Sequence, residues 1–400
     1  MNKNILKTGV QEFIDKYYNT DIMSVLLSKP AFDDISSKEL AQQLSGKKKA
    51  KDKLPTWFRT PGIYYPPGIN LEQTSSEITA RYKARLVSGN KMADLTGGFG
   101  VDTFFFSEQI PDLIHCECDE ELHQIAKHNA VALCQKQTDF LCADGMAFLQ
   151  QTEKTFDWLF LDPGRRDAGK KKVFLLSECE PNVTLYLDLL LSKAERVMIK
   201  ASPMLDLSAG IKELQHVRSI HVVAVENEVK EILWILQKGS APEEISVKTV
   251  NLTKDREEKF DFKWQEEAVT DADFSPPLNY LYEPNSAILK AGAFKLIGNS
   301  MRIYKLHEQS HLYTSEQLVP FPGRVFKVEK VMPANKKHLG PLKGQKVNVT
   351  TRNFPMTVAQ IRKKFSFKDG GDIYLFFTTD YLGKNIAIQC SKIIEEDSSK

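Results

Sequence analysis

A glycine-rich stretch at residues 91–101, K-M-A-D-L-T-G-G-F-G-V, constrains the fold of this chain more than any other segment. An apolar lead-in ends at Asp94, a loop with three glycines follows, and the next run, V-D-T-F-F-F-S, can open a helix. The pattern predicts a strand, a tight loop and a helix N-terminus. Because glycines let backbone N–H groups approach a ligand closely, the loop is a candidate site for a nucleotide-like molecule.

Three further acids follow predicted strands. Glu117 ends a second short strand, about 20 residues after Asp94, which is the spacing of a ribose-binding acid in a dinucleotide-type unit. Asp144 follows a third strand, and Asp162 follows the buried strand at residues 156–161. The alternation of strands and helices predicts an α/β fold, in which the carboxyl ends of parallel strands meet at one ligand-binding edge.

The ordered series D-x-T-G-G-F-G, Glu117, Asp144 and D-P-G-R-R resembles the motifs of class I S-adenosylmethionine (SAM) dependent methyltransferases, over roughly residues 90–238. The resemblance implies a Rossmann-like sheet with SAM as the cofactor. It also implies that the first acid and its loop hold the amino-acid part of SAM, that Glu117 binds the ribose hydroxyls, and that Asp144 lies by the adenine amine. The loop residues so implied are Asp94, Thr96, Gly97, Gly98 and Gly100; the family usually has glycine where Thr96 stands.

The segment from Asp162 to Arg166 is the predicted chemical centre. Relatives that methylate exocyclic amines carry Asn/Asp-Pro-Pro-aromatic here, whereas this chain keeps Asp162 and Pro163 and has Arg165 and Arg166 in the following positions. The resemblance implies that Asp162 holds or deprotonates the acceptor amine. We expect the arginines to grip a phosphate or stack on a base, with a salt-bridged loop as the alternative. Lys200, at the end of the next strand, either pairs with Asp162 or binds an acceptor phosphate.

The same residues allow two other interpretations. The first is an NAD-type Rossmann domain, but the loop lacks G-x-G-x-x-G and no hydride-transfer partner stands out. The second concerns Cys179, whose segment S-E-C-E-P resembles the nucleophilic-cysteine segment of uridine-C5 methyltransferases. In those enzymes the cysteine follows the next strand, whereas here that strand, residues 196–200, comes after Cys179. We therefore interpret Cys179 as structural, with covalent catalysis as the minor alternative.

Residues 1–88 predict a helical lobe. A capping-box pattern begins at Ser36, and the basic run at residues 47–53 is either a solvated linker or a phosphate contact. Residues 72–85 predict one helix just before the first strand of the methyltransferase domain, residues 89–270. Class I methyltransferases often close such a segment over the cofactor, so the resemblance implies that Ser76 or Glu77 reaches the methionine end of SAM. Capping of the helix by Ser75 or Ser76 is the alternative.

Residues 271–400 predict a separate α+β domain, including one helix over residues 286–298. The run V-T-T-R-N-F-P, a basic helix and the D-G-G-D-I-Y-L-F hairpin resemble the THUMP-like module of bacterial methyltransferases, which implies RNA docking. The basic residues clustered there are Arg352, Arg362, Lys363, Lys364 and Lys368. A solvated helix face is the alternative.

Composition limits the remaining classes. The formal net charge is +2, so any RNA-binding surface must be local. The six cysteines lack paired C-x-x-C spacing, so we expect reduced thiols and no metal site. No apolar run is long enough to span a membrane, so we expect no membrane partner and a cytoplasmic location.

The sequence thus predicts a SAM-dependent methyltransferase that modifies a base nitrogen of structured RNA, tRNA or rRNA. A methyltransferase acting on protein or a small molecule would share every cofactor motif. A non-catalytic RNA-binding protein with a vestigial SAM pocket is the other alternative.

Overall fold

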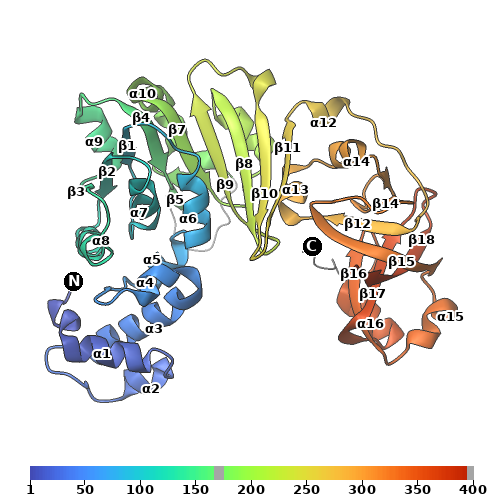
Figure 1. Cartoon of the computed structure of the whole chain (residues 1–400), viewed down its shortest axis with the longest axis horizontal. Helices are drawn as coiled ribbons and strands as arrows, with labels where there is room; N and C mark the ends of the chain where they lie inside the picture. Colours follow the sequence, from blue (N-terminus) through green and yellow to red (C-terminus); the bar gives the residue numbers. More distant parts are fainter. Residues whose placement is uncertain (166–174, 394–400) are drawn as a thin grey trace, which may run out of the picture. The chain divides into compact units, whose positions relative to one another are not determined.

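The computed structural model describes residues 1–165 and 175–393. The chain divides into two compact units (Figure 1). Unit 1 comprises Met1–Arg218 and Ile232–Pro242, and unit 2 comprises Ser219–Glu231 and Glu243–Lys400. The boundaries expected near residues 88 and 270 stay predictions.

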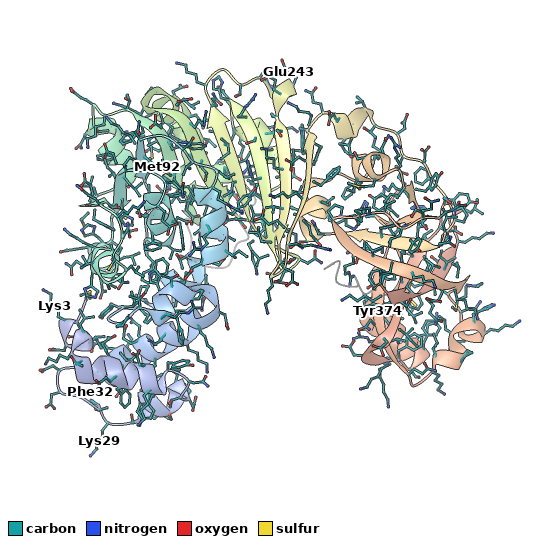
Figure 2. The ribbon with its side chains drawn as sticks, viewed as in Figure 1. Lys3, Lys29, Phe32, Met92, Glu243 and Tyr374 are labelled. Atoms are coloured by element: carbon teal, nitrogen blue, oxygen red, sulfur yellow. The ribbon has the colours of Figure 1, made fainter. Side chains whose placement is uncertain are left out.

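The first part of unit 1 is the predicted helical lobe. Its helices are α1 (Thr8–Tyr17), α2 (Ile22–Leu27), α3 (Ser37–Lys53), α4 (Pro55–Arg59), α5 (Gly68–Gln73) and α6 (Glu77–Ala84). The predicted capping box is present: Ser36 accepts a hydrogen bond from the Glu39 backbone N–H, and the Glu39 carboxylate accepts one from the Ser36 backbone. Phe13 on α1 packs edge-on against Phe32, which Figure 2 labels at the foot of the lobe.

The basic run at residues 47–53 lies inside α3 and is not a linker. Lys47 is buried and pairs with Asp15 on α1. Lys53 donates to the backbone carbonyl oxygens of Leu71 and Glu72, at 2.9 and 2.7 Å. These lysines therefore hold the helices of the lobe together, because their ammonium groups already have intramolecular partners.

Unit 1 continues with the Rossmann-like sheet. Its strands are β1 (Lys91–Asp94), β2 (Asp112–Glu117), β3 (Asp139–Cys142), β4 (Phe156–Leu161), β7 (Ala194–Ala201) and β9 (Glu228–Gln237, of which Ile232–Gln237 belongs to this unit). Here they run in the order β9-β7-β4-β1-β2-β3, and only β9 is antiparallel to its neighbour. Met92 on β1 is fully buried (Figure 2).

Five helices connect or follow these strands: α7 (Val101–Ser107), α8 (Glu120–Ala132), α9 (Gly145–Gln151), α10 (Leu187–Lys193) and α11 (Leu207–Glu213). α6 packs on α7, and α9 packs on α10 (Figure 1). Apolar residues fill the layer between helix and sheet; Phe106 of α7, for example, meets Phe160 of β4 edge-on at 5.1 Å between ring centroids. After β4, the two-stranded ribbon of β5 (Gly164–Arg165) and β6 (Cys179–Glu180) brings a later segment back beside Gly164.

Unit 2 contains most of β8 (Val217–Val225), with β10 (Ser246–Leu252) parallel to it and β11 (Glu257–Lys263) antiparallel to β10. Its second sheet has the order β13-β14-β12-β15-β18-β17-β16. Those strands are β12 (Tyr280–Pro284), β13 (Tyr304–Lys305), β14 (Tyr313–Ser315), β15 (Gly323–Pro333), β16 (Lys346–Arg352), β17 (Lys368–Thr379) and β18 (Asn385–Lys392). Its helices include α12 (Glu266–Val269), α13 (Ser286–Ala291), α14 (Leu296–Met301), α15 (Lys336–Leu339) and α16 (Val358–Phe365).

The second sheet carries an apolar cluster on each of its faces. Phe377 of β17 belongs to one apolar cluster, with Ile361 and Phe365 of α16. The preceding residue, Phe376, belongs to a second cluster, with Phe326 of β15. Successive side chains of a strand point to opposite faces, so this split places a core on each side of β17.

The single helices predicted over residues 286–298 and 72–85 are both wrong. The first is broken after α13, because Gly292 takes a left-handed conformation with a φ of 78°. The second is broken at residues 74–76, between α5 and α6. That break has a functional consequence, because it turns Ser75 toward the pocket described next.

Candidate active site

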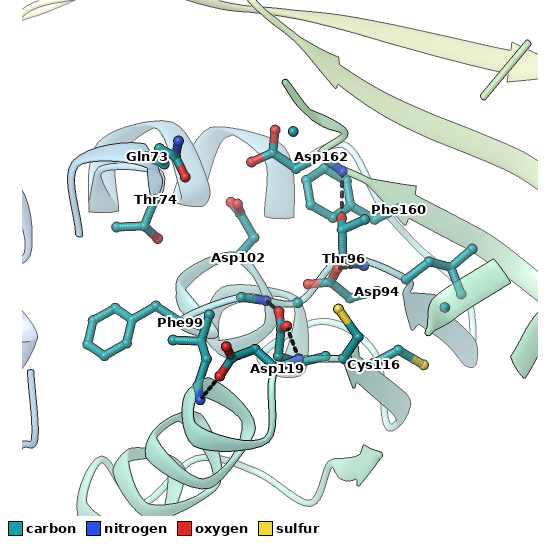
Figure 3. Close-up of a pocket in the computed structure, with 18 of the residues that line it drawn as sticks. Gln73, Thr74, Asp94, Thr96, Phe99, Asp102, Cys116, Asp119, Phe160 and Asp162 are labelled. Carbon is teal, nitrogen blue, oxygen red and sulfur yellow. Dashed lines mark hydrogen bonds between the residues drawn. The ribbon is translucent and has the colours of Figure 1, made fainter. Parts of the chain in front are cut away.

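A pocket of about 360 Å³ lies where the strands of unit 1 end (Figure 3). Asp94 at the end of β1, Glu117 at the end of β2, Asp144 after β3 and Asp162 after β4 all line it. The register explains this meeting: Asp94 lies opposite Phe160 of β4, so the acids end adjacent parallel strands. The structure therefore brings together the four acids that the sequence singled out.

The glycine loop forms the floor of the pocket. Gly98 and Gly100 have φ values of 56° and 83°, a region that side chains other than glycine rarely adopt. Gly97 is required for a different reason: a Cβ there would fall 2.1 to 2.6 Å from three ring atoms of His115. The Gly98 N–H donates to Glu117 Oε2 at 2.9 Å, so the loop is also tied to the end of β2.

Asp94 is the most deeply buried of the four acids, with 1% of its surface exposed. Thr103 Oγ1 donates to Asp94 Oδ2 at 2.7 Å, and the Thr96 N–H donates to Oδ1 at 3.1 Å. Burial raises the pKa of Asp94 to about 7, because a carboxylate loses hydration there. The nearby carboxylates Asp102 and Asp162 raise it further. Asp94 thus favours a cationic ligand group.

His115 supports Asp94 from below the loop. Its Nδ1 lies 2.9 Å from Thr103 Oγ1. Since Thr103 donates its only proton to Asp94, we assign the proton of this contact to His115 Nδ1, which then donates to Thr103. Burial lowers the pKa of His115 to about 3, so the ring is neutral at physiological pH. The chain His115–Thr103–Asp94 therefore orients the carboxylate without neutralising its charge.

Glu117 and Asp144 also line the pocket, and their carboxylate oxygens can accept hydrogen bonds there. Glu117 Oε1 accepts from the Asp119 N–H at 2.7 Å, while Oε2 holds Gly98. Asp144 Oδ1 caps α9 by accepting from the Ala147 N–H at 2.8 Å. Each carboxylate oxygen has further lone pairs, so both side chains can still accept from hydroxyl or amine groups of a ligand.

Asp162 is held at two points. Its backbone N–H donates to Thr96 Oγ1 at 2.6 Å, and its Oδ2 accepts from Lys200 Nζ of β7. The predicted pairing of Lys200 with Asp162 is therefore present. Pro163 follows, and Gly164 lines the pocket. The side chain of Arg165 and the whole of Arg166 lie outside the described residues, so their predicted role stays a prediction.

Glu77 is not placed at the pocket. Its carboxylate accepts from the backbone N–H of Thr56 and, at 2.9 Å, from Thr56 Oγ1, so it ties α6 to α4. Ser75 lines the pocket instead. Its Oγ donates to Asp102 Oδ2 at 2.7 Å and accepts from the buried Lys83 at 2.9 Å.

The pocket residues that sequence reasoning missed include Ser75, Asp102, Asp119 and Glu180. A signal existed for Asp102, because it stands in the first helical turn after the glycine loop. Asp119 follows the second strand and could have been found in the same way. No local signal marks Glu180, which reaches the pocket through the pairing of β6 with β5.

Residues 1–165 and 175–393 contain no group of three or more His, Cys, Asp or Glu side chains that could hold a metal ion. Among the same residues, every helix is too short or too polar to cross a membrane.

The sheet order, the glycine loop and the four strand-end acids define a class I SAM-dependent methyltransferase domain. Two family models match the C-terminal part of the chain: a ferredoxin-like domain over residues 280–322 and a THUMP domain-like family over residues 323–392. The resemblance to a methyltransferase with a THUMP-like domain is confirmed.

A solved structure described as "putative methyltransferase from Porphyromonas gingivalis W83" is 31% identical to this chain. The match covers 98% of this chain and 99% of that one, with a TM-score of 0.89. The chain belongs to the family of that protein.

Two solved structures overlap a smaller share of the chain. One is an rRNA methylase from Streptococcus thermophilus, with 14% identity over 40% of this chain and 94% of that one, and a TM-score of 0.30. The other is a Streptococcus mutans protein in complex with S-adenosylhomocysteine (SAH), with 15% identity over 40% and 96%, and a TM-score of 0.31. No curated protein matches the chain.

Proposed function

We propose that this protein transfers the methyl group of SAM to a base nitrogen of structured RNA, either tRNA or rRNA. One observation carries the proposal: three acids with different surroundings line the same pocket. Asp94 is buried and favours a cationic group, Asp162 is fixed by its backbone hydrogen bond, and Glu117 can accept hydrogen bonds from ribose hydroxyls. A donor with a cationic methionine end, a ribose and a base matches this order of groups. The acceptor then faces Asp162.

The residues of the pocket fit SAM. The glycine loop leaves open space beside Gly98, where a Cβ would meet no atom closer than 3.9 Å. Asp94 would hold the α-ammonium, Glu117 the two ribose hydroxyls, and Asp144 the adenine amine. SAM supplies an activated methyl on sulfur, so the chain's own task is alignment and exclusion of water.

In this proposal, Asp162 is the residue that contacts the methyl-accepting nitrogen. Its carboxylate accepts a hydrogen bond from the acceptor N–H, which aims the nitrogen lone pair at the methyl group. Lys200 orients the carboxylate, because its ammonium contacts Oδ2. The nitrogen proton passes to Asp162 or to water as the methyl bond forms.

The choice of RNA is supported by the C-terminal unit. The THUMP-like match covers α16 and its neighbouring strands. Within the predicted cluster, Arg352 pairs with the buried Glu283, and Arg362 pairs with Asp369. Three lysines, Lys363, Lys364 and Lys368, are exposed and have no carboxylate partner in the described part of the chain. Two of these lysines lie in the last turn of α16 and Lys368 begins β17, and lysines without a carboxylate partner are available for phosphates.

The test is transfer of labelled methyl from SAM into separated RNA, DNA and protein fractions of cells that lack the gene. We expect label in RNA with the wild-type chain and none with Asp162→Ala. Asp188→Asn is the matched control, since this acid is exposed on α10 and its side chain makes no hydrogen bond or ion pair with any residue that the structure describes. Label in protein or in small molecules alone would refute the RNA assignment, and no SAH binding would revive the vestigial-pocket alternative.

A charge-reversal variant tests the docking role in the full chain. Lys363→Glu, Lys364→Glu and Lys368→Glu together should reduce RNA methylation strongly while leaving SAH affinity unchanged. Three exposed lysines of the helical lobe region, Lys3, Lys7 and Lys29, give a control with the same change of net charge. Equal loss in both triple variants would mean that bulk charge, and not this cluster, sets the rate.

A further inference from the structure

We propose that Thr96 is a positioning residue that fixes Asp162 against the cofactor loop. This inference rests on the proposed function, because Asp162 is taken as the group that meets the methyl acceptor. The class I motif that this loop resembles usually has glycine at this position. A glycine has no side chain with which to make the contact that Thr96 makes here.

Thr96 connects the ends of two adjacent parallel strands. Its backbone N–H donates to Asp94 Oδ1 at 3.1 Å, and its side-chain Oγ1 accepts from the Asp162 N–H at 2.6 Å. Asp94 ends β1 and Asp162 follows β4 directly. One residue therefore contacts the acid on the cofactor side and the acid on the acceptor side of the same pocket.

The contact matters because the sheet stops just before Asp162. The last pairing between β1 and β4 joins Asp94 and Phe160, and the Leu95 N–H then donates to the Phe160 carbonyl at 3.0 Å. The pairing between β4 and β7 ends at Leu161. Beyond these points Thr96 supplies the acceptor that the Asp162 N–H needs, and a partly buried N–H is rarely left unpaired.

Asp162 is consequently held at its backbone by Thr96 and at its carboxylate by Lys200. A methyl transfer requires donor sulfur, methyl and acceptor nitrogen in line, and a displacement of about 1 Å can cost about a hundredfold in rate. Lys200 alone fixes only the carboxylate end, so loss of the Thr96 contact should free the loop that carries Asp162.

Thr96→Val and Thr96→Ser separate this role from packing. Valine keeps the branched shape and removes the hydroxyl, whereas serine keeps the hydroxyl. With labelled SAM and RNA from cells lacking the gene, we expect Thr96→Val to lower methyl transfer by about tenfold to a hundredfold. SAH affinity, measured by calorimetry, should stay within about threefold, and Thr96→Ser should restore most of the rate. Wild-type rates in Thr96→Val would overturn the proposal, as would an equal loss of SAH affinity, which would make Thr96 a cofactor contact.

Hydrogen exchange tests the contact without any acceptor. In the full-length chain, the peptide covering residues 158–163 should exchange faster in Thr96→Val than in wild type, and at the wild-type rate in Thr96→Ser. Unchanged exchange in Thr96→Val refutes the positioning role. If the wild-type chain fails to methylate RNA, the proposed acceptor is wrong, and this exchange comparison still decides the role of Thr96.

Discussion

Replacing Lys83 by methionine should destabilise unit 1 more than the loss of any surface ion pair. Lys83 is 0% exposed; its Nζ lies 3.2 Å from Asp102 Oδ1 and donates to Ser75 Oγ at 2.9 Å. Methionine is unbranched and of similar length, so it fills most of the space. The Asp102 carboxylate, with only 10% of its side chain exposed, would lose its counter-charge.

Breaking a buried ion pair by removing one partner typically costs about 3–5 kcal/mol. We take about 3 kcal/mol here, since Asp102 retains its bond from Ser75. For a unit of this size the melting temperature should fall by about 6–12 °C, measured by calorimetry. Lys49→Met is the matched control: the side chains of its pair with Glu72 are 40% and 66% exposed, so the expected loss of stability is much smaller.

The double variant Lys83→Met with Asp102→Asn identifies the cause. If an uncompensated charge is responsible, removing both charges should recover much of the stability lost in Lys83→Met alone. A double variant that melts as low as Lys83→Met would point to packing. A Lys83→Met chain that melts within about a degree of Lys49→Met would refute the reasoning altogether.

Three further outcomes follow from the pocket. Asp94 binds a cation only when ionised, so SAM affinity should fall by up to about tenfold per pH unit below pH 7, and Asp94→Asn should abolish that dependence in titrations. The stability of the ligand-free fold should change in the opposite direction with pH. Burial raises the pKa of Asp94 above its value in the unfolded chain, so the ionised carboxylate lowers the free energy of unfolding above pH 7. This destabilisation disappears as the pH falls toward 4. Glu117→Gln should weaken SAH binding by about tenfold or more, measured by calorimetry. Gly97→Ala should lower the melting temperature, because the new Cβ meets His115, whereas Gly9→Ala, with no atom within 4 Å, should not.

The strand-end acids could be predicted because the signal is local and repeated. Each of Asp94, Glu117, Asp144 and Asp162 follows a short apolar run, and parallel strands connected by helices must place these ends on one edge. No further sequence signal is needed to align the strand ends: Asp94 at the end of β1 pairs with Phe160 of β4, two residues before Asp162. The resemblance to a known family supplied the roles, which the residue pattern alone left open.

Other side-chain positions could not be predicted, because they depend on contacts between residues that are distant in sequence. The position of the Glu77 side chain could not be predicted, because its place in a helix gives no information about Thr56, the residue that its carboxylate binds. Ser75 was hidden by the apparent continuity of a polar helix through residues 72–85, and only the structure shows the break. The contacts of Lys47 and Lys53 could not be predicted, because their partners, Asp15 and the carbonyl groups of residues 71 and 72, lie on other helices.

The distribution of charge around the pocket explains why Asp94 should meet the cationic end of the cofactor. Asp102 and Asp162 each have a lysine partner, Lys83 and Lys200. Asp94 has only neutral donors among the described residues. A buried carboxylate without a counter-ion is costly, which is why its pKa rises to about 7. A ligand ammonium placed there supplies the missing charge, so its binding should draw the pKa of Asp94 back down and release a proton near neutral pH.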